Sequence, residues 1–394
     1  MRLFSSFKHY NFRLYFTGQA LSLLGIWMQG TAVSWLTWKL TSSPRWLGAV
    51  AFASQIPILI FGLFAGVVAD RVKRLRLIVV IQIFAMFQAV ILAFLTLTGQ
   101  INAPLIFFLS LFLGVVFAFD YPARQSFLMD MVGRDNIGNA VALNSSIVHG
   151  ARVMGPVVAG LIAAHFGEGM CFAVNAISFI FVLAALLMMK RNELYPQVME
   201  SHGSVNCSIK EGLRFVWNTR EIRRPLKLMA IFSLAGMVYV ALLPQIIGER
   251  FGGTARELGF AMSSAGFGAL SGAVYLAVRK GTCGLYKIIR FFLGLAGVGS
   301  ILVSVSPNLY FLIPALVITG LSGFMVVAGT NTIMQTTSPP EYRGRIMSIF
   351  TVAFFGLMPV GSLIAGQVAS VVGAPFTIAI GGIICLIAGN LGKP

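Results

Sequence analysis

The sequence predicts an all-α membrane protein with twelve transmembrane helices in two six-helix bundles, related by a pseudo-two-fold axis along the membrane normal. Two observations carry this prediction. The 394 residues are 57% hydrophobic and only 10% charged, with a mean hydropathy of +0.87, whereas soluble chains carry about 25% charged residues. Residues 1–188 also align with residues 207–394 at a constant offset, and the two copies share glycines at nine aligned positions; about two would coincide by chance.

The shared glycines indicate that both copies pack their helices alike, because glycine lets helix backbones approach closely. The aligned pairs are Gly30/Gly236, Gly62/Gly268, Gly66/Gly272, Gly114/Gly320, Gly138/Gly344, Gly150/Gly356, Gly155/Gly361, Gly160/Gly366 and Gly167/Gly373. We therefore interpret the chain as one helical unit used twice.

Each copy holds six apolar stretches of the length that a membrane span needs, about 20 residues. They are 14–38, 46–69, 76–98, 104–128, 138–163 and 168–190, then 226–248, 256–278, 286–305, 308–333, 345–367 and 374–390. This order predicts an N-terminal bundle over 1–190, a cytoplasmic linker over 191–225 and a C-terminal bundle over 226–394. Within the linker, residues 208–217 place Ile209, Leu213, Val216 and Trp217 near one helical face, which predicts either a short amphipathic helix on the membrane surface or a plain linker.

The net charge of +17 reflects topology rather than nucleic-acid binding. Most Lys and Arg residues cluster in alternate loops, whereas only Lys39, Arg45, Arg250 and Arg256 fall on the opposite side. The positive-inside rule then places both termini in the cytoplasm, with the basic loops against anionic lipid head groups. The four cysteines lack metal-binding spacing, and no nucleophile–base cluster appears. We expect no metal, cofactor or enzymatic activity.

The second predicted span ends in Gly66-Val-Val-Ala-Asp70-Arg71-Val-Lys73-Arg74-Leu-Arg76. An acid followed by bases at a helix end either gates the inner side, through Gly66, Asp70, Arg71 and Arg74, or simply stops membrane insertion. The second copy keeps the glycine as Gly272 but has Leu276 in place of the acid. A charge found on one copy alone favours the gate.

This segment resembles the inner-loop signature of the major facilitator superfamily, with Lys73 where that signature usually has a second glycine. A second motif, Gly150-Ala-Arg152-Val-Met-Gly155-Pro156-Val-Val-Ala-Gly160, resembles the antiporter signature of the same superfamily, which is associated with export. Its small residues also suit close helix packing without any directional meaning, through Gly155, Pro156 and Gly160.

Further motifs resemble the drug-exporting branch that includes enterobactin and macrolide exporters. They are Asn11-Phe-Arg13-Leu-Tyr-Phe-Thr-Gly-Gln19, Asp120-Tyr-Pro122-Ala-Arg124-Gln125, Asn139-Ala-Val-Ala-Leu-Asn144-Ser145 and Ser338-Pro-Pro-Glu341-Tyr-Arg343-Gly-Arg345. The resemblance runs nearly end to end and implies a drug:proton antiporter of the bacterial inner membrane. By this resemblance we expect Glu341, Arg343 and Arg345 to take part in gating.

Charges at membrane depth are costly and functional by default. Asp120 and Arg124 lie one helical turn apart. Either Asp120 pairs alternately with Arg124 and with a proton during coupling, or the two residues form a permanent structural pair. His149 is either a proton relay or a hydrogen-bonded residue at a helix contact. Arg152 either neutralises an anionic substrate or locks a helix pair. These four form the predicted proton-coupling set.

All these charges belong to the first copy, whereas the spans of the second copy offer neutral polar groups. We expect a substrate cavity between the bundles, shared by both copies and walled partly by aromatic side chains. Its predicted lining is Gln19, Trp27, Gln29, Asn144, Tyr239, Gln245, Asn331 and Gln335.

These features predict a secondary active transporter, a monomer, that exports a small amphipathic siderophore, macrolide or other drug by proton antiport. Its partners would be that substrate, protons and membrane lipids, and no nucleic acid. Two alternatives stay open: a proton-coupled or facilitative importer of a nutrient or metabolite, and a membrane sensor or scaffold that transports nothing.

Overall fold

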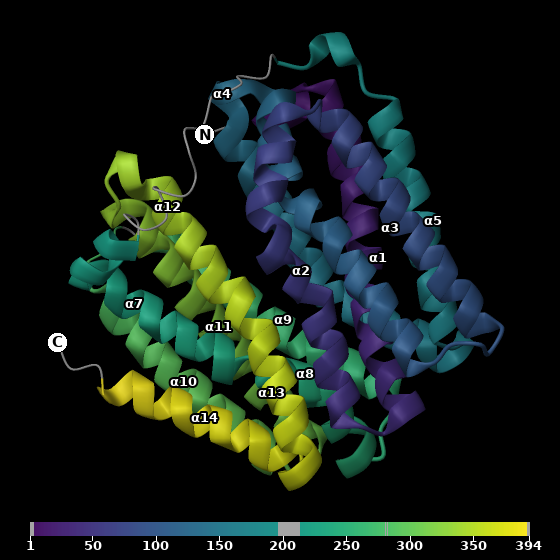
Figure 1. Cartoon of the computed structure of the whole chain (residues 1–394), viewed down its shortest axis with the longest axis vertical. Helices are drawn as coiled ribbons and strands as arrows, with labels where there is room; N and C mark the ends of the chain where they lie inside the picture. Colours follow the sequence, from purple (N-terminus) through teal and green to yellow (C-terminus); the bar gives the residue numbers. More distant parts are fainter. Residues whose placement is uncertain (1–3, 196–212, 280, 282, 392–394) are drawn as a thin grey trace.

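The computed structural model describes residues 4–195, 213–279, 281 and 283–391, with the backbone alone at 63, 67, 70, 340, 341 and 343. Every regular element in these ranges is a helix. Figure 1 shows the helices of the first half of the sequence on one side and those of the second half on the other.

The first half consists of long helices joined by short connections. They are η1 (Ser5–Lys8), α1 (Tyr10–Thr41), α2 (Pro44–Arg71), α3 (Arg74–Leu97), α4 (Ala103–Phe166), α5 (Glu168–Leu187) and η2 (Arg191–Glu193). α4 is 64 residues long and departs from helical geometry at Gly133, where φ is 70°. A positive φ at this point favours glycine, so α4 contains two helical stretches that meet at Gly133.

The second half has more broken helices. They are α7 (Arg220–Ile231), η3 (Phe232–Gly236), α8 (Val238–Gln245), η4 (Ile246–Arg250), α9 (Ala255–Val278), α10 (Leu285–Val305), α11 (Leu309–Thr337), α12 (Pro340–Thr351), η5 (Val352–Gly356), α13 (Leu357–Val372) and α14 (Ala374–Leu391). η3, η4 and η5 are π-helical turns: η3 follows α7, η4 ends α8, and η5 joins α12 to α13.

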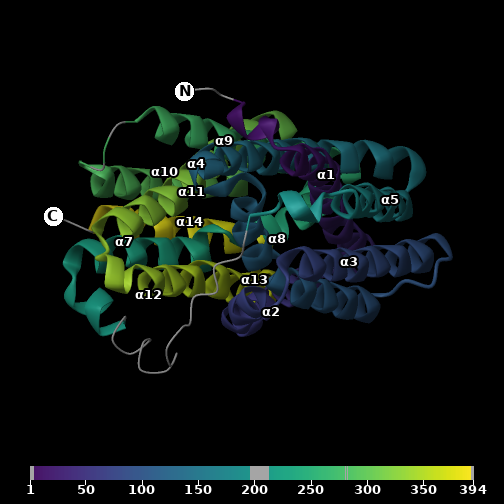
Figure 2. The same ribbon diagram turned by 90° about the horizontal axis from the view of Figure 1, so that it is seen from above.

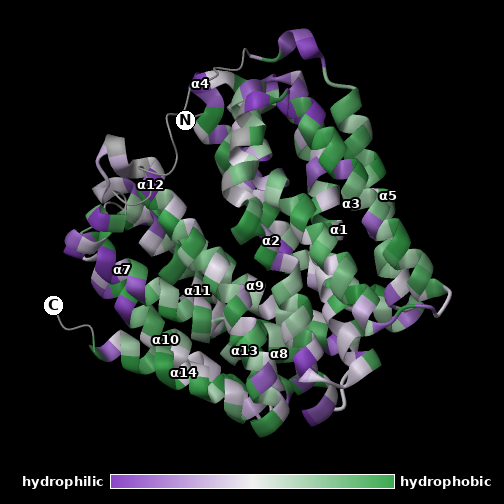
Figure 3. Cartoon of the chain, in the orientation of Figure 1, coloured by the Kyte–Doolittle hydropathy of each residue, from purple (hydrophilic) through white to green (hydrophobic). Residues whose placement is uncertain are grey.

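Ten helices of the described chain are long and apolar enough to cross a membrane. One of them is the whole of α4, which covers two of the twelve predicted spans, and α1 is not among the ten although it has 32 residues. The chain is thus a multi-pass membrane protein. Figure 3 shows hydrophobic residues dominating the helices, with hydrophilic residues gathered toward their ends.

Several helix boundaries recur at the offset of the sequence repeat. Asn102 caps α4 by accepting a hydrogen bond from the Leu105 amide, and Asn308 caps α11 in the same way. Gly167 and Gly373 separate the last two helices of each copy with φ values of 82° and 86°. Asn side chains satisfy the free amides at a helix start, so these ends are set locally by the repeated sequence.

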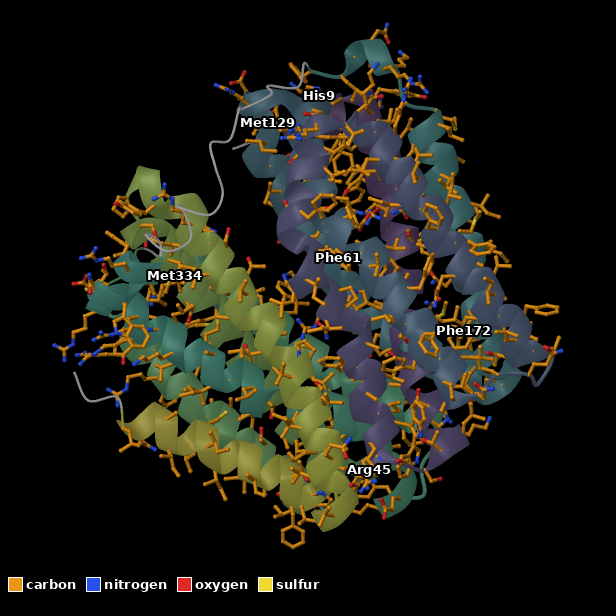
Figure 4. All side chains as sticks on the ribbon, viewed as in Figure 1. His9, Arg45, Phe61, Met129, Phe172 and Met334 are labelled. Atoms are coloured by element: carbon orange, nitrogen blue, oxygen red, sulfur yellow. The ribbon has the colours of Figure 1, made fainter. Side chains whose placement is uncertain are left out.

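The two halves contact each other along α2 and α13 and along α4 and α9, pairs that lie side by side in Figures 1 and 2. A β-carbon added at Gly48 would lie 2.5 Å from the Ser362 carbonyl oxygen, and one at Gly366 would lie 3.0 Å from the Gly48 α-carbon. Arg45 also donates a 2.8 Å hydrogen bond from Nε to Ser370 Oγ. In Figure 4, Arg45 lies at the end of the molecule opposite to His9 and Met129.

One hydrophobic core cluster joins the halves near this same end. It combines Trp35, Trp38 and Leu47 of the first half with Leu242 and Leu258 of the second half. Many large apolar side chains elsewhere are exposed, for example Phe108 and Phe291 at 63% and 65%. Exposed apolar side chains of this size are the normal outer surface of a protein solvated by lipid.

The predicted linker helix is only partly within the described residues. The chain is helical over 213–218, whereas Ile209 lies outside the described residues. Val216 is buried in the core cluster of the second half, while Leu213 and Trp217 are exposed. The ammonium of Lys227 lies 4.9 Å from the ring centroid of Trp217.

Candidate functional site

The predicted pair of Asp120 and Arg124 forms within α4. Arg124 Nε lies 2.5 Å from Asp120 Oδ2, and both side chains are largely buried. Gln82 of α3 donates a hydrogen bond of 3.2 Å from Nε2 to the other carboxylate oxygen, Oδ1. Because both carboxylate oxygens have partners, the charge of Asp120 is compensated inside the first half of the molecule.

A second ion pair, which sequence reasoning missed, joins α3 to α4. Arg74 Nη1 donates to Asp130 Oδ1 at 2.8 Å, with both side chains nearly buried. Asp130 lies three residues before Gly133. The Tyr195 ring covers this glycine closely, because a β-carbon at Gly133 would lie 2.9 Å from Tyr195 Cζ. The Tyr195 amide also donates to the Asp130 carbonyl oxygen at 2.8 Å. The available sequence signal was an acid just after the predicted span 104–128, on the same side of the membrane as Arg74, which was already a gating candidate.

We expect the Arg74–Asp130 pair to couple energetically. Arg74→Met would leave a nearly buried carboxylate without this partner and lower the free energy of unfolding by about 3 kcal/mol. Adding Asp130→Leu should recover part of that loss, since the charges are then removed together. Chemical denaturation in detergent measures the free energy of unfolding of the wild type, both single variants and the double variant, which together form a double-mutant cycle.

The control for this cycle is the exposed Lys190–Glu193 pair, at 2.9 Å. Glu193→Gln should lower the free energy of unfolding by less than about 1 kcal/mol. Strict additivity of Arg74→Met and Asp130→Leu would show that the two charges do not stabilise one another.

The other predicted gating residues are only partly visible. The side chains of Asp70, Glu341 and Arg343 lie outside the described part of the chain. A β-carbon at Gly66 would have no neighbour within 4 Å. The remaining basic residues are Arg71, which is exposed, and Arg345, whose Cζ lies 5.3 Å from the Tyr342 ring centroid.

Two of the predicted cavity residues, Gln19 and Gln29, are buried inside the first half. Gln29 donates to Gln88 Oε1 at 3.0 Å and accepts from Asn175 Nδ2 at 2.7 Å. Gln88 in turn donates to the Leu109 carbonyl oxygen at 3.3 Å. This network ties α1, α3, α4 and α5 together, so both polar atoms of Gln29 are engaged in helix packing. Gln19 is 2% exposed.

The predicted cavity residues of the second half also pair with near neighbours. Gln245 donates to Glu249 Oε2 at 2.8 Å within one turn, and Gln335 donates to Asn331 Oδ1 at 2.6 Å. Gln335 is exposed. Three other predicted residues differ in burial: Trp27 and Asn144 are partly buried, and Tyr239 is 3% exposed.

The glycine–proline motif of α4 lies against both α1 and α9. A β-carbon at Gly155 would lie 3.2 Å from the Met28 amide nitrogen of α1, and one at Gly160 would lie 2.8 Å from the Ala255 carbonyl oxygen of α9. Pro156 contributes its carbonyl oxygen to the contact with Gly259. The motif therefore lies where the first half of the chain meets the second.

His149 and Arg152 lie on the same stretch of α4. The His149 ring packs edge-on against Phe324 of α11, with the ring centroids 5.5 Å apart. The guanidinium carbon of Arg152 lies 5.5 Å from the centroid of the Trp27 ring of α1. Neither residue contacts the Asp120–Arg124 pair, so the structure separates the predicted coupling set into two places along α4.

Buried ion pairs within one half of a molecule whose two halves meet along membrane-spanning helices are typical of polytopic membrane transporters. The chain belongs to the transmembrane secretion effector family of the major facilitator superfamily, whose model matches residues 2–393. The family membership confirms the resemblance that the sequence motifs predicted.

The chain is similar along nearly its whole length to several named transporters. It is 25% identical to the staphyloferrin A transporter of Staphylococcus aureus, covering 95% of this chain and 94% of that protein. The multidrug efflux pump Tap of Mycolicibacterium fortuitum is 25% identical, with coverage of 87% and 85%. Macrolide efflux protein A of Streptococcus pyogenes is 20% identical, with 96% of each chain covered.

Solved structures show the same fold at lower identity. The chain matches a structure of the nucleoside transporter NupG with a TM-score of 0.76 and 12% identity, over 96% of this chain and 97% of that chain. It matches an inward-facing, unoccupied bacterial homologue of the lysosomal transporter Spinster with a TM-score of 0.73 and 13% identity, over 96% and 95%.

Proposed function

We propose that this protein exports a small amphipathic molecule across the bacterial inner membrane in exchange for protons. The observation that carries the proposal is the buried Asp120–Arg124 pair with its Gln82 hydrogen bond. It occurs in a chain whose relatives are named for the efflux of drugs and macrolides and for the transport of a siderophore. An acid at membrane depth with a single guanidinium partner suits proton uptake and release.

In the proposed coupling step, a proton takes the place of Arg124 on Asp120. The freed guanidinium then needs a new partner, and the arrangement of α4 against α3 and α1 changes with it. Loss of the proton restores the ion pair. The two states of Asp120 thus bias the transporter toward two conformations.

The proposed topology has twelve crossings in two bundles, with both termini in the cytoplasm. At 1.5 Å per residue, the 64 residues of α4 would extend about 96 Å if straight, about three times the hydrocarbon thickness. α4 therefore supplies two crossings that meet at Gly133, and α1 supplies one more. The N-terminal bundle would cover 1–190 and the C-terminal bundle 226–394, joined by the 191–225 linker.

Alternating access would follow from rocking the bundles about their shared contacts. The glycine contacts between α2 and α13 and between α4 and α9 close one end of the molecule. By the positive-inside rule this is the outer end, because Lys39, Arg45 and Arg256 belong to it. The proposed inner gate consists of the Gly66–Arg74 segment and the segment around Glu341.

The exporter is tested in proteoliposomes that contain the purified protein. An imposed pH gradient with an acidic lumen should drive accumulation of at least one of three compounds, erythromycin, ethidium and 7-methoxycoumarin-3-carboxylic acid, to at least about tenfold above protein-free liposomes. A deletion strain should show lower tolerance to the same compound, or less iron-chelating activity in the medium. Loss of growth on a nutrient in place of these effects would favour an importer, and ligand binding without transport would favour a sensor.

A further inference from the structure

Arg152 differs in its surroundings from the cations of the described helices that have an acid as partner. Arg74, Arg124 and Lys39 each form an ion pair with a carboxylate. Within the described part of the chain, the Arg152 guanidinium has no ion pair and no hydrogen bond. The side chain is partly buried near the start of the Gly150–Gly160 motif.

The neighbours of Arg152 are mostly aromatic and come from both halves of the chain. The ring of Trp27 of α1 lies under the guanidinium, with its centroid 5.5 Å from Arg152 Cζ. The titratable groups in electrostatic contact with Arg152 are His149, one turn earlier, and Tyr239 of α8. Phe324 of α11 packs on His149. The guanidinium therefore faces aromatic and neutral groups rather than an acid.

The backbone around Arg152 is held firmly against α9. Ser263 Oγ donates a 2.6 Å hydrogen bond to the Val153 carbonyl oxygen, and a β-carbon at Gly266 would lie 3.0 Å from the Arg152 carbonyl oxygen. A group bound at the Arg152 guanidinium would consequently lie where the two halves of the chain meet.

Holding a cation at this position is costly. Charged side chains within membrane-spanning helices face the bundle interior or a water-filled cavity, pair with one another or with backbone carbonyls, and mark substrate or ion pathways. A cation–π contact contributes about 1–2 kcal/mol, less than the several kcal/mol that desolvation of an ion costs. Since the described residues place no carboxylate here, a bound anion would supply the negative charge that the guanidinium lacks.

We propose that Arg152 binds a carboxylate of the transported molecule. This inference rests on the proposed export function and names its substrate class: an amphipathic monocarboxylate whose apolar part packs on Trp27. One guanidinium matches one carboxylate in charge and in its two-pronged geometry, whereas multiply charged phosphate groups are usually held by clusters of cations. Because the site joins both halves, binding there biases their relative arrangement.

The probe pair for the test is 7-methoxycoumarin-3-carboxylic acid and its ethyl ester, which share one ring system, whereas the ester has an ethyl group and no negative charge. Binding to the full-length protein in detergent is measured by fluorescence polarisation. The wild-type protein should bind the acid at least about tenfold more tightly than the ester. Arg152→Gln should remove this preference, and Arg152→Lys should retain part of it. The matched control, Arg45→Gln, removes a cation that bonds Ser370 elsewhere and should leave the preference unchanged.

A chemical measurement on the wild-type protein tests the same site without a variant. Phenylglyoxal modifies accessible guanidinium groups, and mass spectrometry identifies modified residues. The acid should protect Arg152 at least about tenfold better than the ester, with no protection at Arg45. Equal binding of acid and ester, a preference retained in Arg152→Gln, or no protection of Arg152 would each overturn the proposal. Equilibrium binding needs no proton gradient, so a failed efflux assay with intact acid preference would contradict the export proposal alone.

Discussion

Replacing Asp120 with Asn is expected to reduce efflux driven by a pH gradient by at least about tenfold. Asn keeps the size of the side chain and one acceptor oxygen, in place of the two oxygens that accept from Gln82 and Arg124, and it cannot alternate between a charged and a protonated form. Proton entry should then no longer be linked to substrate exit. The measurement is uptake into proteoliposomes under an imposed pH gradient.

Two comparisons separate a coupling role from a structural one. Substrate exchange at equal pH on both sides should persist in Asp120→Asn. Exchange needs substrate binding and the movement of the two bundles, but no net proton movement. Asp135→Asn is the matched control, since Asp135 is an exposed acid on the same long helix. Undiminished gradient-driven efflux in Asp120→Asn would rule out Asp120 as the coupling acid, and loss of exchange as well would indicate a structural pair.

A substitution at Gly48, in the contact between α2 and α13, is expected to shift the equilibrium between two conformations of the transporter. Gly48→Val places two methyl groups where even a β-carbon would lie 2.5 Å from the Ser362 carbonyl oxygen. Overpacking of this kind costs about 1–3 kcal/mol, which corresponds to about a 5–150-fold shift between two conformations. The substitution should therefore favour the state in which this end of the molecule is open.

A single cysteine introduced near this contact, for example Ser370→Cys, reports the shift through its labelling rate with a membrane-impermeant maleimide. Labelling should be faster in the Gly48→Val background. Gly62→Val is the matched control on the same helix, because a β-carbon at Gly62 has no neighbour within 4 Å. Equal labelling rates in both backgrounds would contradict the idea that this glycine contact holds the end closed.

Sequence reasoning reached the Asp120–Arg124 pair because its two members lie one turn apart on one helix, where spacing alone determines proximity. It missed Asp130 as the partner of Arg74, which lies 56 positions earlier. It also counted Gln29 among the cavity residues without its partner Asn175, which is 146 positions away. No periodicity or motif encodes such pairs, since they depend on how helices that are distant in sequence pack.

The sequence by itself determined that the chain is a helical membrane protein built on a repeat. Composition decides which solvent a chain can occupy, and local hydrogen bonding decides helix ends such as those capped by Asn102 and Asn308. Only the tertiary structure decided which intramembrane charges are neutralised within the protein. Asp120 and Arg124 compensate each other in one half, whereas Arg152 faces Trp27 and the second half without an acid. The physical reason is that charge compensation depends on distances of a few ångströms between separate helices, and those distances arise only when the helices pack.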